Sequence, residues 1–158
     1  MQLNSPDITD GHAMNAKPVI FLLGLLFLSL SSARALDDLL ITEFMAANDG
    51  VLLDEDGDSS DWIEVHNAGT NTVNLLGWFL TDRGNDLTKW RFPSTNLAAN
   101  GYLVVFASGK DRRVPGAPLH TSFQLSKGGE YLALVKPDGT SIASAYAPVF
   151  PPDRKSVV

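Results

Sequence analysis

The sequence of 158 residues contains no cysteine. This absence excludes a disulfide scaffold, a cysteine-ligated zinc or iron–sulfur centre and a thiol nucleophile. Basic residues are also few, with 12 Lys and Arg against 18 Asp and Glu, so the formal net charge is −6. Such a chain lacks the basic stripe of a nucleic-acid-binding protein and the basic cluster that attaches a protein to anionic lipid. Both functions are therefore disfavoured.

Long hydrophobic runs are missing as well. The most apolar stretch, residues 19–30 (VIFLLGLLFLSL), is shorter than the about 20 residues that a membrane-spanning helix needs. Lys17 precedes this stretch, and the small residues Ala33 and Ala35 lie at the −3 and −1 positions of a cut after Ala35. This pattern is typical of a secretory signal peptide, and the alternative is a buried core helix.

The signal peptide sets the expected layout of the chain. We expect a signal peptide over residues 1–35, a globular domain over 36–150 and a linker-like tail over 151–158. Met14 is the expected initiator, because two aspartates precede it and lie ahead of the positive region. The protein is then expected to be secreted, to the extracellular space or the cell envelope, with no transmembrane segment in the mature chain.

Short strand-like runs separated by turn residues follow residue 38. Pro137-Asp138-Gly139 is a strong hairpin signal, because proline presets φ and glycine accepts a positive φ. No segment after residue 38 sustains a helical period. The sequence therefore predicts an all-β fold, an antiparallel β-sandwich of about seven to nine strands. The expected strands cover residues 39–45, 62–66, 73–81, 88–92, 102–107, 120–125, 131–136 and 141–146.

Alternation along residues 62–66 predicts which side chains face the core. Ile63 and Val65 share one face and are expected to be buried, whereas Glu64 and His66 are expected on the outer face. Trp62 is expected to cover an edge. The run 102–106 (YLVVF) is nearly all apolar, which predicts a central strand that is buried on both faces.

Several segments resemble the lamin tail domain. Their order and spacing carry the resemblance, which covers roughly residues 39–147. The resemblance implies an immunoglobulin-like β-sandwich that acts as a non-catalytic module and binds partners. The segments are ITEFMAAN at 41–48, DWIEVHN at 61–67, LLGWFLTD at 75–82, WRFP at 90–93, GYLVVFASGK at 101–110 and HTSFQLSKGGE at 120–130.

Lamin tails themselves act in the nucleus, which an export signal excludes. Bacterial members of the family are exported and often lie beside other domains, including kinase-like domains of the spore-coat type. The resemblance therefore implies an extracellular or cell-surface interaction module that binds protein or surface-polymer partners. The alternative is an N-terminal accessory domain of a longer secreted enzyme whose catalytic part lies beyond Val158.

An acidic run at residues 54–61 (DEDGDSSD) indicates Ca²⁺, a hard cation that takes about 6–8 oxygen ligands. Asp54, Asp56 and Asp58 follow the i, i+2, i+4 spacing of calcium loops, and Asp61 completes the candidate set. The match to an EF-hand is poor, because no glutamate stands at the twelfth loop position and no flanking helices are expected. The alternative is a solvated acidic loop without an ion.

Lys110, Arg112 and Arg113 form a basic cluster in the long loop 109–119. They are the candidate partner-binding residues, because their charges suit an anionic polymer such as phosphate-rich wall material or nucleic acid. The alternative is a solvated loop whose charge Asp111 partly neutralises.

Three tryptophans are the aromatic candidates for a binding surface. Trp62, Trp78 and Trp90 would suit a carbohydrate-stacking platform if exposed, but anchoring of the sandwich core is favoured.

A metal-dependent site would need Glu64, His66 and His120 to converge, which no spacing predicts. Ser108 lacks the G-x-S-x-G frame of a nucleophile elbow, and phosphate-binding motifs are absent from the sequence. We expect no enzyme activity and no cofactor other than calcium.

Overall fold

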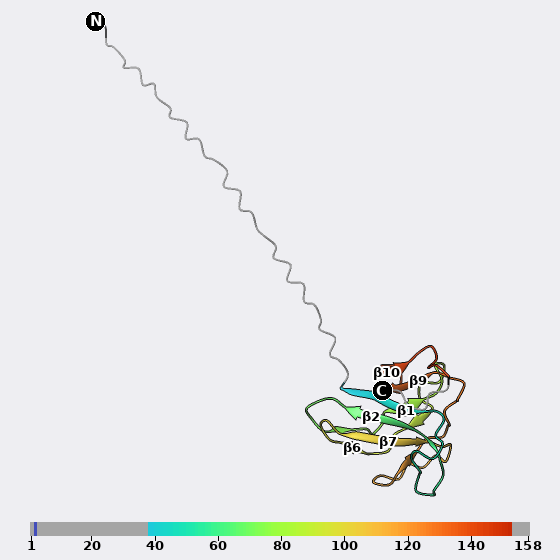
Figure 1. Ribbon diagram of the computed structural model, residues 1–158. Coiled ribbons are helices and arrows are strands. Elements are labelled where there is room, and N and C mark those ends of the chain that lie inside the picture. Colours follow the sequence, from blue (N-terminus) through green and yellow to red (C-terminus); the bar gives the residue numbers. More distant parts are fainter. Residues whose placement is uncertain (1, 3–37, 153–158) are drawn as a thin grey trace. The chain divides into compact units, whose positions relative to one another are not determined.

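The computed structural model describes residues 2 and 38–152. This part of the chain contains ten strands and no helix (Figure 1). The signal peptide expected over residues 1–35 lies, apart from Gln2, outside the described residues, as does the tail from residue 153. The strands are β1 (Leu39–Met45), β2 (Asp61–Asn67), β3 (Val73–Asn74), β4 (Phe79–Thr81), β5 (Trp90–Arg91), β6 (Asn96–Leu97), β7 (Tyr102–Ala107), β8 (Leu119–His120), β9 (Leu132–Val135) and β10 (Ile142–Tyr146).

The strands form two four-stranded sheets, in the orders β1-β2-β7-β8 and β10-β9-β4-β5, and a separate pair, β3-β6. Figure 1 shows β1, β2 and β7 side by side, and β9 next to β10. Neighbouring strands are antiparallel throughout the described sheets, except for β7 and β8. The predicted antiparallel β-sandwich is confirmed, but its ten described strands exceed the seven to nine that were expected. The described part of the chain holds no helix of the length and apolarity that a membrane crossing requires.

The edge strands β1 and β10 close one side of the sandwich through side chains. The Ile41 N–H donates a hydrogen bond of 3.1 Å to Ser144 Oγ, and the Tyr146 hydroxyl donates one of 3.4 Å to the Ile41 carbonyl. These bonds satisfy backbone groups that an open edge would leave free to pair with another strand. The two-residue strands β5 and β8 form the opposite edges, so the domain presents no long open edge within its described sheets.

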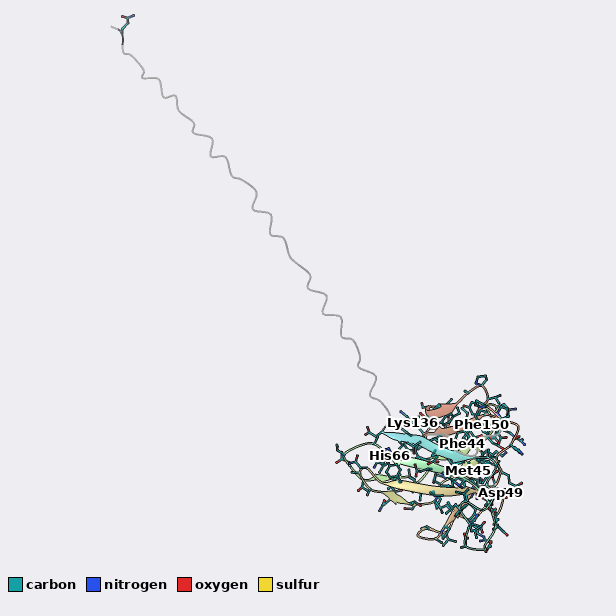
Figure 2. The ribbon with its side chains drawn as sticks, viewed as in Figure 1. Phe44, Met45, Asp49, His66, Lys136 and Phe150 are labelled. Atoms are coloured by element: carbon teal, nitrogen blue, oxygen red, sulfur yellow. The ribbon has the colours of Figure 1, made fainter. Side chains whose placement is uncertain are left out.

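The core between the sheets is built from aliphatic and aromatic side chains. Ile63 and Val65 are fully buried, as the alternation along β2 predicts. The Phe44 ring packs against Tyr146 and Phe150, with centroid distances of 4.9 and 4.7 Å, and Figure 2 shows Phe44 and Phe150 close together. Phe150 is only 1% exposed, so the packed core reaches beyond the last strand.

The strand prediction was wrong over two runs. Residues 73–81 are not continuous but form β3 and β4, because the chain turns between them at Gly77, which has a φ of 88°. The run 120–125 ends its strand at His120, because Thr121 Oγ1 donates to the Phe123 carbonyl and holds a turn. The short strand β6 was not predicted, since two residues give no periodic signal.

On the outer face of the sheet β1-β2-β7-β8, some side chains are buried and others are exposed. Tyr102, expected to be buried, is 60% exposed and stacks on His66 with a centroid distance of 4.2 Å. Trp62, expected at an edge, lies on the inner strand β2 in a row with Met45 and Phe106, and all three are buried. Both expectations were wrong because alternation along a strand cannot show which positions on its outer face are buried.

Candidate functional site

Two loops meet where β2 begins and β7 ends. The acidic loop, residues 54–61, leads into β2, and the basic loop, residues 109–119, follows β7. Their meeting follows from the sheet register, because Asp61 lies opposite Ala107. Asp49, which precedes the acidic loop, and His66 lie at opposite ends of this sheet in Figure 2. The candidate site is therefore built by two loops at one end of the sheet.

Asp54 organises the acidic loop. Its Oδ1 accepts the backbone N–H of Asp56 at 3.0 Å and that of Asp58 at 3.1 Å, and its Oδ2 accepts the Ser60 hydroxyl at 2.7 Å. The side chain is fully buried. A short acidic side chain that binds the backbone two residues on is typical of tight turns. Asp54 is therefore first a structural residue of this loop.

Lys110 joins the basic loop to the acidic loop. Its Nζ lies 2.6 Å from Asp54 Oδ2, 2.7 Å from Asp56 Oδ2 and 2.9 Å from Asp58 Oδ2. These are three of the four residues predicted to bind calcium, and their carboxylates offer oxygens within 4.8 Å of one another. The fourth, Asp61, instead accepts the Asn48 N–H at 3.0 Å. Calcium binding stays a prediction, and an ion at these carboxylates would compete with the Lys110 ammonium.

The two arginines of the basic loop also contact acidic groups of the chain. Arg112 lies 2.6 Å from both Glu55 Oε1 and Asp56 Oδ2. Arg113 Nε lies 2.7 Å from Asp111 Oδ1. The assignment of Lys110, Arg112 and Arg113 as partner-binding residues stays a prediction.

Asp111 also connects the basic loop to the core. Its Oδ1 accepts the indole N–H of Trp90 at 3.1 Å, and Arg113 lies over the Trp90 ring at 5.7 Å. Trp62 and Trp90 are buried, and Trp78 packs against the core. The three tryptophans therefore do not form an exposed stacking platform.

The ion pairs shift the pKa values of the acidic loop. Burial alone would raise the pKa of Asp54, but hydrogen bonds from Lys110, Ser60 and the loop backbone hold it well below its ordinary value of 3.8. Hydrogen bonds from Arg112 and then Lys110 lower the pKa of Asp56 to about 2. Asp61 has the opposite shift, because burial raises its pKa and the Asn48 N–H offsets this only in part. The lowered pKa values keep Asp54 and Asp56 ionised at neutral pH.

His120 forms a second link between the loops. The ring is fully buried, with Nδ1 2.8 Å from Ser108 Oγ and Nε2 2.9 Å from both carboxylate oxygens of Glu55. It also stacks on Phe106, with a centroid distance of 5.2 Å. Burial would raise the pKa of Glu55, but hydrogen bonds from its own backbone, His120 and Arg112 lower it.

The structure does not bring together Glu64, His66 and His120, the metal site whose convergence no spacing in the sequence predicts. Glu64 accepts a hydrogen bond from Thr42 at 2.8 Å, and His66 stacks on Tyr102. Among the described residues, the group that could hold a metal ion contains no histidine. Sequence reasoning missed the contact of Glu55 with His120, because 65 residues separate them and no local motif joins them.

A polar surface cleft of about 380 Å³ opens beside the two loops. Asp58 and Asp61 line it from the acidic loop, and Ser108, Lys110 and Gln124 line it from the other side. The cleft is therefore lined by polar side chains that can bind a small molecule, although most of their charges are paired within the protein.

The two facing sheets define an immunoglobulin-like β-sandwich. The chain belongs to the Lamin Tail Domain family, whose model matches residues 32–148. This match confirms the resemblance seen in the sequence. A comparison with curated proteins found no match to this chain.

Proposed function

We propose that this protein is an exported interaction module that binds a partner outside the cell, at the cell surface or in the envelope. Membership of the Lamin Tail Domain family supports the interaction role. The apolar stretch 19–30 and the Ala33 and Ala35 positions support export. The candidate partners are a protein and a surface polymer. The exposed aliphatic loop between β1 and β2 favours a protein.

The observation that carries the proposal is a run of exposed aliphatic residues between β1 and β2. Val51, Leu52 and Leu53 are 73%, 37% and 52% exposed. Single exposed aliphatic residues are ordinary, but adjacent ones that form an apolar patch are typical of interaction sites. We call residues 51–53 the apolar tip.

Hydrogen bonds from Asn48 hold the apolar tip in shape. The Asn48 Oδ1 accepts the Val51 N–H at 3.0 Å, and its Nδ2 donates to the carbonyls of Leu52 and Ser60. A tip that is already ordered loses little conformational entropy on binding. This order supports a role in recognition rather than in a flexible linker.

Charges around the apolar tip indicate the chemistry of the partner. Asp49 lies just before the tip, and the acidic loop follows it directly. The neighbouring cations Lys110 and Arg112 are paired with that loop. We therefore infer a protein partner whose apolar patch has a basic rim, since charges of opposite sign favour and orient association.

Capture of surface proteins from the producing cells tests this proposal. The purified protein is immobilised beside a variant with Val51→Ser, Leu52→Ser and Leu53→Ser, and a control with Leu76→Ser, which changes another exposed leucine. We expect the wild type and the control to retain the same protein and the triple variant to lose it. Equal capture by all three would contradict the proposal.

The coding sequence beyond Val158 separates the two forms of this function. A catalytic domain there would make this domain an accessory module that directs a secreted enzyme to its target. A stop codon would indicate a separate binding protein. In both cases the apolar tip is the expected contact.

A further inference from the structure

Three segments that are distant in sequence place a serine, a histidine and a carboxylate in hydrogen-bonded order. Ser108 follows β7, His120 ends β8, and Glu55 belongs to the acidic loop. We propose that Ser108 is a nucleophile activated by His120, with Glu55 as the positioning residue, and that it accepts an acyl group from a carboxylic ester bound in the adjacent cleft. This activity is additional to the interaction role, and it departs from the non-catalytic role that the family resemblance implies.

The hydrogen bonds of His120 set the direction of proton transfer. Both carboxylate oxygens of Glu55 lie 2.9 Å from Nε2, and because a carboxylate accepts hydrogen bonds, the proton of the ring is assigned to Nε2. In the neutral ring, Nδ1 is then the unprotonated nitrogen and accepts the Ser108 hydroxyl over 2.8 Å. A nucleophile, a base in contact with it and a third group that orients the base are the arrangement required for an activated serine.

The surroundings of the ring support its role as a base. His120 is fully buried and packs on Phe106, so it cannot rotate freely away from Ser108. Arg112 Nη1 lies 2.6 Å from Glu55 Oε1 and holds the carboxylate in place. Rigid contacts of this kind keep reacting groups in position, which supplies part of the rate of an enzymatic step.

Ser108 is also within reach of a substrate. The residue is half-buried and lines the cleft of about 380 Å³ together with Asp58, Asp61 and Gln124. The backbone N–H of Lys110 donates to Ser108 Oγ at 3.2 Å and helps to fix the position of this oxygen. The carboxylates in the cleft favour esters that carry neutral polar or cationic groups over anionic ones.

The proposed step is a transacylation. Ser108 Oγ attacks the ester carbonyl, its proton moves to His120 Nδ1, and a bond forms between Oγ and the carbonyl carbon. The bond between this carbon and the alkoxy oxygen then breaks, and the alkoxy group takes the proton from Nδ1 and leaves as an alcohol. The products are acyl-Ser108 and the alcohol, and the enzyme returns to its first state when water hydrolyses the acyl group.

Reaction with p-nitrophenyl acetate tests the step. We expect release of p-nitrophenol and an acetyl group on Ser108, identified by mass spectrometry of the digested protein. Ser108→Ala abolishes the adduct, His120→Asn slows acylation by about a hundredfold, and Glu55→Gln slows it by about tenfold or more. Ser122→Ala, which changes an exposed serine nearby, leaves the rate unchanged. Equal p-nitrophenol release by the wild type and Ser108→Ala would overturn the proposal.

Nuclear magnetic resonance of the imidazole nitrogens gives a test that does not depend on a folded His120 variant. The proposal requires the tautomer with the proton on Nε2, and Glu55→Gln is expected to move the Nε2–H resonance while circular dichroism stays that of the wild type. A proton on Nδ1 at neutral pH would overturn the proposal, because this nitrogen could not then accept the Ser108 proton.

Discussion

Lys110 Nζ lies 2.6 Å from the fully buried carboxylate of Asp54, and this contact joins two loops that are 56 residues apart in sequence. The same carboxylate accepts two backbone N–H groups of its own loop. Asp54 therefore both shapes the acidic loop and attaches the basic loop to it.

The first prediction concerns Asp54 directly. Asp54→Ala leaves two backbone N–H groups, the Ser60 hydroxyl and Lys110 without this acceptor, so we expect a loss of about 3 kcal/mol in the free energy of unfolding. Asp58→Ala is the matched control, because its side chain is 64% exposed and contributes a single ion pair. Its loss is expected to stay below about 0.5 kcal/mol. Urea denaturation measures both, and equal losses would show that Asp54 has no special role.

Stability is expected to depend on pH through the same cluster. Asp56 has a pKa of about 2 in the folded protein against an ordinary 3.8, so it stabilises the fold above about pH 4. This contribution is lost as the pH falls through the folded pKa, and the lowered pKa values of Asp54 and Glu55 act with the same sign. Asp61, whose pKa is raised, acts in the opposite sense.

Arg112→Gln checks the origin of this dependence. The variant removes the largest cause of the low pKa of Asp56, so its unfolding free energy should fall less between pH 4 and about pH 2 than that of the wild type. Urea denaturation at several pH values gives both curves. Parallel curves would mean that Arg112 does not set the pKa of Asp56.

Calcium and Lys110 are expected to compete. If calcium binds at Asp54, Asp56 and Asp58, removal of the ammonium frees the carboxylates. Several millimolar CaCl₂ should then raise the melting temperature of Lys110→Met more than that of the wild type, each compared with excess EGTA. Adding Asp56→Asn and Asp58→Asn should remove the difference. An equal calcium effect in both proteins would place any ion elsewhere.

The packed end of the core gives a prediction about the domain boundary. Phe150 is 1% exposed and packs on Phe44, although it lies beyond residue 148, where the family match ends. Phe150→Ala is expected to cost about 4 kcal/mol, as for other buried aromatic side chains. Val149→Ala, at a neighbouring 54% exposed residue, should change stability little. A small effect of Phe150→Ala in thermal denaturation would place residue 150 outside the folded unit.

The sheets could be predicted from the sequence because the alternation of apolar and polar residues along a strand indicates which side chains face the core. Ile63 and Val65 alternate with Glu64 and His66, and both aliphatic residues are buried. The division of residues 73–81 was not predicted, because the turn at Gly77 interrupts a run that is apolar on both sides. Composition within a short window cannot distinguish one strand from two.

The sequence predicted which residues belong to the candidate site but not which of them contact one another. The acidic and basic loops were recognised separately, and their pairing depends on the register that places Asp61 opposite Ala107. Ser108 was set aside because it lacks a local motif, whereas its partner His120 comes from another strand. Such relationships arise from the topology of the sheet, which a local pattern does not contain.

Binding to intact producing cells tests the central claim most directly. The purified protein is titrated onto these cells, and its affinity is compared with that of the variant carrying Val51→Ser, Leu52→Ser and Leu53→Ser. The proposed interaction module predicts saturable binding by the wild type and by Leu76→Ser, and at least tenfold weaker binding by the triple variant, or about 1.4 kcal/mol. Equal affinities of the wild type and the triple variant, or no saturable binding by the wild type, would contradict it.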